Sequence, residues 1–193
     1  MITVGVLDLQ GGVAEHLKSL EQIPEVNPIP VKKKEKLNNL DGLILPGGES
    51  TTMGKLINIF NLKEPIIKLA KQGTPIWGTC AGMILLAQKI KDETNHLGLM
   101  NITVQRNGYG NQLDSFVVKK AIPEISDKKI PLVFIRAPYI TEVGPKAKIL
   151  LKLNNKIVAV EEDNLLVTSF HPELEDDLTM HHYFIEKIKN NSI

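Results

Sequence analysis

The sequence predicts an α/β protein, folded as one three-layer domain with a mixed, mostly parallel sheet flanked by helices. Two observations carry this prediction. In the first half, short apolar runs end in glycine-rich turns, and apolar residues at helical spacing follow them. From Ile102 onwards the hydrophobic period shifts toward two, which is typical of strands. At 193 residues, 42% of them hydrophobic, the chain suits a single domain over residues 1–193 with a sizeable core.

The first half of the chain carries the strand–helix alternation. Residues 2–8 form an apolar, β-branched run, the turn Gln10-Gly11-Gly12 follows, and residues 13–20 have helical spacing. Residues 26–31 predict a short strand near an edge of the sheet, because two prolines interrupt it. A further helix is expected over residues 61–72.

The second half predicts antiparallel strands and a closing helix. The expected strands cover residues 102–106, 115–118, 132–135, 147–153, 156–160 and 165–170. The turns Asn154-Asn155 and Asp163-Asn164 separate close pairs of these runs and predict hairpins. Residues 178–189 have helical spacing and predict the last helix. The connection after Ala87 has no clear period and is expected to be exposed.

Charge and composition argue against several functional classes. Lys and Arg total 23 against 22 Asp and Glu, so no global charge favours nucleic acid or an anionic membrane. The apolar runs fall short of the roughly 18 residues that span a bilayer, and the N-terminal sequence lacks the regions of a signal peptide. One cysteine cannot form an intrachain disulfide, which fits a reducing cytosol. We therefore expect a cytoplasmic protein.

Gly78-Thr79-Cys80-Ala81-Gly82 is the most informative stretch. It lies between an apolar run and a helical run, and it is the cysteine form of the Gly-x-Ser-x-Gly elbow that joins a strand to a helix. The flanking glycines allow strand and helix to fold back on each other. The turn would present the Cys80 sulfur beside the first amides of the helix, which stabilise a thiolate. Cys80 is therefore a candidate nucleophile.

Pro46-Gly47-Gly48 ends another buried strand, over residues 42–45. Two glycines let backbone N–H groups point into a cleft, as an oxyanion hole requires, although in isolation a flexible strand–helix turn is the better explanation of the pattern. Ser50 or Thr51 is expected to cap the helix that begins near Met53.

His171-Pro172-Glu173 ends the last strand. If this end and that of the elbow strand share one sheet edge, His171 faces Cys80 as its base, and Glu173 fixes the imidazole tautomer. A turn with a capping histidine explains the tripeptide alone, but it does not explain three such motifs at strand ends.

The other four histidines are expected to take no part in the chemistry. We predict His16 on a helix flank, His96 on the surface, and His181 and His182 as surface or packing residues. The last two lack metal-ligand spacing, and no metal is expected.

With these motifs, the chain resembles the class I (triad) glutamine amidotransferases, and within them the PdxT/SNO family, the glutaminase subunits of pyridoxal 5′-phosphate synthase. The resemblance covers essentially the whole chain. Its motifs are Val6-Leu7-Asp8-Leu9-Gln10-Gly11, Leu45-Pro46-Gly47-Gly48-Glu49-Ser50-Thr51, Gly78-Thr79-Cys80-Ala81-Gly82-Met83, Gln105-Arg106-Asn107, Phe134-Ile135-Arg136-Ala137-Pro138 and His171-Pro172-Glu173-Leu174.

The resemblance implies a flavodoxin-like fold and hydrolysis of L-glutamine, with ammonia passed to a separate synthase subunit. That subunit would be a PdxS/SNZ-type (β/α)8 barrel in a large hetero-oligomer, and no cofactor is implied. The triad would be Cys80, His171 and Glu173, with Gly48 and Ala81 as oxyanion donors. Glutamine contacts would come from Gly48, Glu49, Ser50, Arg106, Ile135 and Arg136. The turn Gln10-Gly11-Gly12 would respond to the partner.

Four positions depart from the family pattern, none of them in the triad. Asp8 stands where a small residue is usual, Tyr109 where phenylalanine is usual, Asn111 where arginine is usual and Glu175 where threonine is usual.

Two other functions remain open from the residues alone. One is a cysteine peptidase or stress-type hydrolase on a similar sheet, which would not need Arg106 and Arg136. The other is a catalytically silent binding module, against which the intact triad argues.

Overall fold

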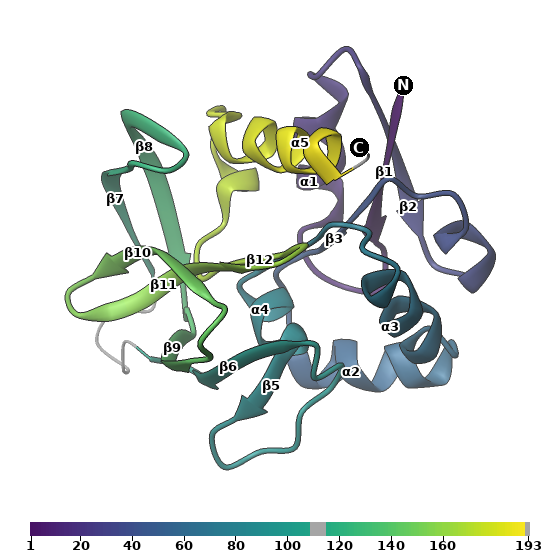
Figure 1. Ribbon diagram of the computed structural model, residues 1–193, viewed down its shortest axis with the longest axis horizontal. Helices are drawn as coiled ribbons and strands as arrows, with labels where there is room; N and C mark the ends of the chain where they lie inside the picture. Colours follow the sequence, from purple (N-terminus) through teal and green to yellow (C-terminus); the bar gives the residue numbers. More distant parts are fainter. Residues whose placement is uncertain (109–114, 192–193) are drawn as a thin grey trace.

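The computed structural model describes residues 1–108 and 115–191. Strands and helices alternate through its first half, and strands dominate the second (Figure 1). The elements are β1 (Ile2–Leu7), α1 (Val13–Glu21), β2 (Val26–Val31), η1 (Lys34–Leu37), β3 (Gly42–Leu45), α2 (Ser50–Ile59), α3 (Lys63–Lys71), β4 (Ile76–Thr79), α4 (Ala81–Leu86), β5 (Ala87–Ile90), β6 (Met100–Gln105), β7 (Ser115–Ile122), β8 (Ser126–Ile135), β9 (Tyr139–Val143), β10 (Lys148–Leu153), β11 (Lys156–Glu162), β12 (Leu165–Thr168), η2 (Pro172–Leu174) and α5 (Thr179–Asn191).

The main sheet is mixed, as predicted. Its order is β2-β1-β3-β4-β12-β11-β9-β6-β5, with β10 paired to β11. The block from β2 to β12 is parallel, whereas β11 pairs antiparallel with β12, β10 and β9. Both predicted hairpins are therefore present, and β7 and β8 form a separate antiparallel ribbon.

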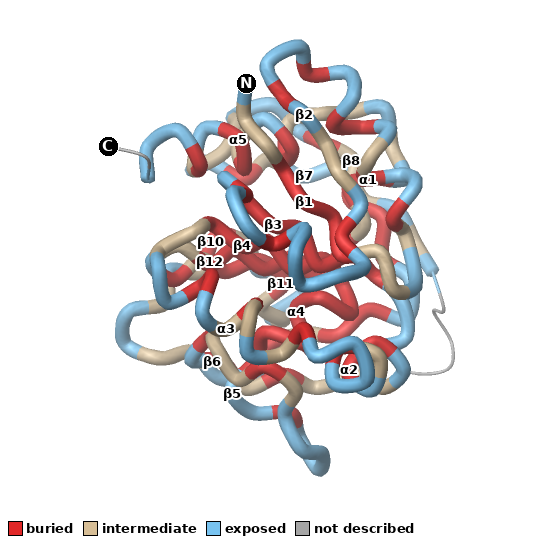
Figure 2. The backbone as a smooth tube through the Cα atoms, turned by 90° about the vertical axis from the view of Figure 1, so that its right-hand side faces the viewer, coloured by how far each residue is buried: buried red, intermediate tan, exposed pale blue. Residues whose placement is uncertain are grey.

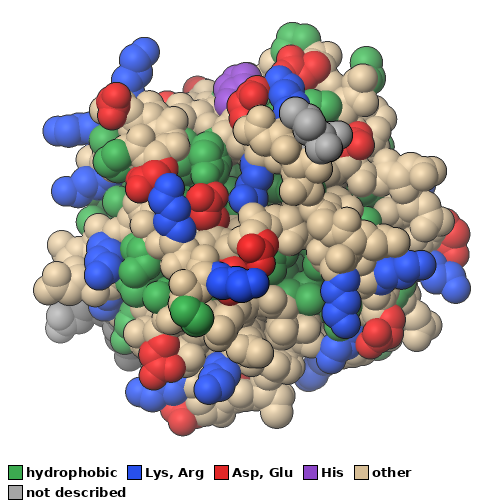
Figure 3. Space-filling model, in the orientation of Figure 1, with side chains coloured by type: hydrophobic (Ala, Val, Ile, Leu, Met, Phe, Trp, Pro, Cys, Tyr) green, Lys and Arg blue, Asp and Glu red, His purple; other side chains and the backbone are tan. Residues whose placement is uncertain are grey.

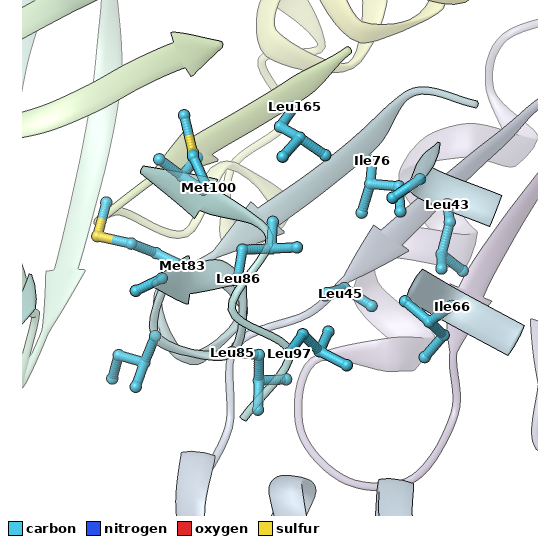
Figure 4. Packing of buried hydrophobic residues seen from close by; sticks show 14 of the residues in the cluster. Leu43, Leu45, Ile66, Ile76, Met83, Leu85, Leu86, Leu97, Met100 and Leu165 are labelled. Carbon is cyan, nitrogen blue, oxygen red and sulfur yellow. The ribbon is translucent and has the colours of Figure 1, made fainter. Parts of the chain in front are cut away.

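Helices cover both faces of the parallel block, which confirms the three layers. Alternate residues of the buried strands enter two separate cores: Leu43 and Leu45 of β3 pack on one face, and Ile44 packs on the other. The first core includes α2, α3 and α4. Figure 4 shows side chains of α3 and α4 meeting those of the sheet within it. The second includes α1, α5 and the β7–β8 ribbon. The central strands are the most buried part of the chain (Figure 2).

Several local predictions need correction. The helix expected near Met53 begins at Ser50, and its N-cap is Glu49 rather than Ser50 or Thr51. The connection after Ala87 begins with a strand, β5, and β9 was not predicted at all. His96 is half-buried rather than on the surface, because its ring lies against Gly54 of α2.

The surface agrees with the near-zero net charge. On the face seen in Figure 3, acidic and basic side chains are interspersed rather than gathered by sign. Helix length and hydrophobicity were a separate prediction. None of the helices in the described part of the chain is long and apolar enough to cross a membrane.

Candidate active site

Cys80 lies on a strained turn between β4 and α4. Its backbone has φ 48° and ψ −101°, a conformation that residues with a side chain rarely adopt and that is found at functional sites. Its N–H donates to the carbonyl of Thr168 at 2.8 Å, which ties the turn to β12. The side chain is buried, with 7% of its residue exposed. The predicted elbow is therefore present.

The two glycines of the elbow are required by close packing. A Cβ on Gly82 would lie 2.0 Å from the carbonyl oxygen of Leu45, and one on Gly78 would lie 2.5 Å from the carbonyl carbon of Gly82. Both contacts are with backbone, which cannot move aside cheaply. Helix α4 can therefore start directly above β3 and β4 only with glycine at these positions.

The elbow and the His-Pro-Glu segment meet at one edge of the sheet. Strands β4 and β12 are parallel neighbours, with Thr79 in register with Thr168. Their carboxyl ends therefore point the same way, and Cys80 and His171 follow those ends one and three residues later. The N–H of His171 donates to the carbonyl of Val133 at 2.8 Å, which fixes the segment to β8.

His171 bridges the thiol and a carboxylate. Its Nδ1 lies 2.8 Å from Oε1 of Glu173, and its ring also interacts electrostatically with the Cys80 thiol. Burial lowers the pKa of His171, but the hydrogen bonds and charges of Cys80 and Glu173 outweigh it and raise this pKa to about 10. The arrangement favours an imidazolium beside a thiolate, the reactive form of a cysteine nucleophile.

Glu173 is enclosed, with 1% of its side chain exposed. Burial raises its pKa, but His16 and His171 oppose this effect, and the net shift is downward. The carboxylate therefore stays ionised and can accept from the imidazole.

Two histidines that sequence reasoning set aside lie behind this carboxylate. His16 is fully buried rather than on a helix flank: its Nε2 lies 3.4 Å from Oε2 of Glu173 and 3.2 Å from Oγ1 of Thr79. Its Nδ1 lies 3.2 Å from Nε2 of His181, which is also fully buried. We call Glu173, His16, His181 and Thr79 the buried side of the site. Only the apolar spacing around His16, with Val13 and Leu20 at i−3 and i+4, could have indicated its burial.

The Pro-Gly-Gly turn lies against both the histidine and the Gln10–Gly12 turn. A Cβ on Gly47 would lie 2.3 Å from Cε1 of His171, so the glycine backbone packs on the ring. The carbonyl of Gly47 accepts from the N–H of Gly12 at 3.0 Å, and Oε1 of Gln10 accepts from the N–H of Glu49 at 2.7 Å. The two predicted loops are thus in direct contact.

A second group of polar residues carries charge at the surface. Arg106 donates through one nitrogen to both oxygens of Glu93, at 3.0 and 2.8 Å, and through the other to Glu49 at 3.2 Å. We call Arg106, Glu49 and Glu93 the charged rim. Hydrogen bonds from Thr52 and Thr51 lower the pKa of Glu49 to about 2, although slight burial opposes them. Glu93 was not among the predicted site residues, since it stands in a polar run with no motif.

The remaining predicted site residues are spread around this centre. Ser50 is buried, and its Oγ has no hydrogen-bond partner among the described residues. The carbonyl of Ile135 lies 3.9 Å from the Cys80 sulfur, and the exposed Arg136 follows it with a φ of 44°. Ala81 is the first residue of α4.

Of the unusual positions, Asp8 pairs with Lys32 at 3.2 Å and Glu175 follows η2. Tyr109 and Asn111 lie outside the described residues. Over residues 1–108 and 115–191, no group of three or more His, Cys, Asp or Glu could hold a metal ion.

Comparison with known proteins decides the family. Residues 6–190 match the SNO glutamine amidotransferase family. The chain belongs to this family. It is 53% identical to the pyridoxal 5′-phosphate synthase subunit PdxT of Ruminiclostridium cellulolyticum, over 97% of this chain and 100% of that protein. It is 55% identical to the protein of the same description from a Thermoanaerobacter species, over 94% and 97% of the two chains.

Solved structures agree with this assignment. A crystal structure described as a glutamine amidotransferase matches 96% of this chain and 98% of its own, with a TM-score of 0.91 and 38% identity. A putative GMP synthase subunit from Thermoplasma acidophilum, at 18% identity and a TM-score of 0.65, shares the fold. The predicted family, fold class and glutamine amidotransferase activity are confirmed, and the peptidase and silent-module alternatives are not supported.

Proposed function

We propose that this chain is the glutaminase subunit of a pyridoxal 5′-phosphate synthase, with Cys80 as nucleophile, His171 as base and acid, and Glu173 as the residue that orients His171. The observation that carries the proposal is that His171 interacts with both Cys80 and Glu173. The names of the PdxT relatives support the biosynthetic role.

The proposed reaction has two halves. The Cys80 thiolate attacks the side-chain carbonyl carbon of L-glutamine, and the C–N bond breaks as the His171 imidazolium gives its proton to the leaving nitrogen, which departs as ammonia. A glutamyl thioester remains. His171 then takes a proton from water, the hydroxide attacks the thioester, and the C–S bond breaks to give glutamate and the thiolate–imidazolium pair again.

The N–H groups of Gly48 and Ala81 would hold the oxyanion in both halves. Losing one such donor costs typically about 2.7–4 kcal/mol of transition-state stabilisation. Because the carbonyl of Gly47 accepts from Gly12 and no peptide bond is cis in the described residues, the N–H of Gly48 points away from the Gln10–Gly12 turn. This contact supports a role for that turn in setting the direction of the Gly48 donor.

The charged rim matches the two charges of a free amino acid. Arg106 would hold the α-carboxylate of glutamine, and Glu49 would accept from its ammonium group. Three residues complete the proposed substrate contacts: Ser50, whose Oγ has no partner among the described residues, Ile135, whose carbonyl lies 3.9 Å from the Cys80 sulfur, and Arg136, which follows Ile135. A peptidase would have no need of such a paired rim.

The ammonia would pass to a synthase subunit of the PdxS/SNZ type, a (β/α)8 barrel in a large cytoplasmic hetero-oligomer. Docking near the Gln10–Gly12 turn would act on the oxyanion donor through Gly12 and Gln10, whose contacts reach Gly47 and Glu49.

The test is ammonia release from L-glutamine by the full chain, with and without the synthase subunit. We expect the synthase to raise the rate, and a Cys80→Ala chain with the same synthase to release none above background. Equal rates with and without the synthase would contradict the partner-dependent part. No glutaminase activity in either condition would contradict the proposed function.

A further inference from the structure

The carboxylate of Glu173 has two oxygens, and the triad uses one of them. Oε1 receives the hydrogen bond from Nδ1 of His171 at 2.8 Å. Oε2 is buried and has no hydrogen-bond partner in the described part of the chain, although Nε2 of His16 lies within ion-pair distance of it, at 3.4 Å. A buried carboxylate oxygen without a donor is costly. The mechanism above leaves His16 without a role.

The contacts around His16 decide which of its nitrogens carries the proton. Burial lowers the pKa of His16 despite the opposing charge of Glu173, and it lowers that of His181 to about 3, so each ring holds a single proton. If His16 carried it on Nδ1, the lone pair of Nε2 would face the carboxylate. With the proton on Nε2, that nitrogen faces two oxygens, Oγ1 of Thr79 at 3.2 Å and Oε2 of Glu173 at 3.4 Å, and Nδ1 accepts from Nε2 of His181 at 3.2 Å.

We propose that His16 is a positioning residue of this active site: its Nε2–H holds Oε2 of Glu173, so that Oε1 stays aligned with His171. His181 acts one step further back, because its own Nε2–H fixes the tautomer of His16. The remaining nitrogen of His181, Nδ1, has no partner in the described residues, so the chain of donors ends there. This inference rests on the proposed function, since it assigns His16 a part in the same triad.

The position of His16 on α1 makes this role specific. Helix α1 starts directly after the Gln10–Gly12 turn and packs on η2, which carries Glu173. A Cβ on Gly12 would lie 2.9 Å from Oε1 of Glu173. The carboxylate is thus enclosed between the start of α1 and η2, and His16 is the polar side chain that α1 directs at it.

The experiment compares His16→Gln with His16→Asn in the full chain, with the synthase present. The glutamine amide nitrogen can occupy the place of Nε2, whereas the shorter asparagine places its nitrogen near Nδ1 and leaves Oε2 without a donor. We expect His16→Asn to lower kcat about 10- to 100-fold, as losses of supporting hydrogen bonds do, with little change in KM. His16→Gln should keep most of the wild-type kcat. Ser19→Ala, another buried position of α1, is the control.

A second readout separates positioning from mere support of the fold. The rate of Cys80 alkylation by iodoacetamide against pH reports the thiolate–imidazolium pair, and it needs neither glutamine nor the synthase. Without a donor on Oε2, the pKa of Glu173 should rise, so the acid limb of the profile should move to higher pH in His16→Asn but not in His16→Gln. Apart from His16, the titratable group acting on Glu173 is His171, on its own segment. Glu15 of α1 acts on His16, His182 of α5 acts on His181, and Cys80 at the elbow acts on His171.

The outcomes are distinct. If wild-type protein shows the alkylation profile but no ammonia release, the proposed function fails while the positioning role is still tested by alkylation. If His16→Asn keeps the wild-type kcat and profile, the inference is wrong. The inference is also wrong if both variants lose the same share of activity, that share equals the loss of folded protein measured by circular dichroism, and the pH profile of Cys80 alkylation does not change.

Discussion

The two sides of His171 are built on opposite principles. On the buried side, Glu173 is enclosed and two histidines that burial keeps uncharged stand behind it. On the charged rim, Arg106 and Glu93 keep about a quarter to two-fifths of their side chains exposed, at 26% and 39%. Buried polar groups cannot exchange partners with water, so the partners that they have are fixed. Exposed ions can exchange partners at little cost.

This difference shows which part of the site is rigid and which part can change its contacts. On the proposed function, the buried side would set the orientation and protonation of His171 before any ligand arrives. The rim holds Arg106 in exposed ion pairs, which the carboxylate of the proposed substrate would replace. Substitutions on the buried side should therefore act on kcat, and those on the rim on KM.

The largest effect is expected at the elbow, between the two sides. Cys80→Ala and Cys80→Gly should each reduce glutamine hydrolysis by at least about 10⁴-fold, because no nucleophile remains. They should differ in stability, since glycine tolerates the φ of 48° and alanine does not. We expect the free energy of unfolding, measured in urea, to be about 1 kcal/mol higher for Cys80→Gly than for Cys80→Ala. Equal stabilities would mean that the turn stores no strain.

The buried side predicts a dependence of stability on pH. The pKa of His171 is about 10, above the value of about 6.5 for an unfolded histidine, so its protonated form stabilises the folded state. This contribution is fully present below pH 6.5 and declines as pH rises toward 10. The difference in unfolding free energy between wild type and His171→Gln should therefore shrink over that range. A difference that grows with pH would contradict the assigned ion pair.

The sequence was a good guide to what local patterns encode. The parallel strands, the elbow and the His-Pro-Glu segment could be predicted because each is a contiguous motif at a strand end. The contact between His16 and His181 could not, since 165 residues separate them and the two rings meet only in the folded chain, where both also pack on Trp77 of β4. Strand β9 was missed because its residues alternate poorly, and its pairing with β6 and β11 defines it.

The charged rim predicts a smaller effect on stability at Glu49. Its carboxylate caps α2 by accepting from the N–H groups of Thr51 and Thr52, at 3.1 and 2.7 Å. Glu49→Ala should lower the free energy of unfolding by about 1 kcal/mol, as the loss of an N-cap does. Glu49→Gln keeps an acceptor and should lose less. If the two variants were equally stable, the cap would contribute nothing and the residue would serve the substrate alone.

The smallest effect concerns Glu93, and it tests whether the rim exchanges partners. The carboxylate of Glu93 occupies the Arg106 nitrogen that the substrate would need, so removing its charge should free the arginine. An exposed pair of this kind is worth about 0.2–1 kcal/mol, so Glu93→Gln should lower the KM for glutamine by no more than about fivefold, with kcat unchanged.

Glu142→Gln is the matched control, because that exposed carboxylate accepts from Thr103 instead. It removes the same charge and should leave KM unchanged. A rise in KM in Glu93→Gln alone would reverse the assignment: Glu93 would then be a binding partner of the substrate ammonium, and the rim would be as fixed as the buried side.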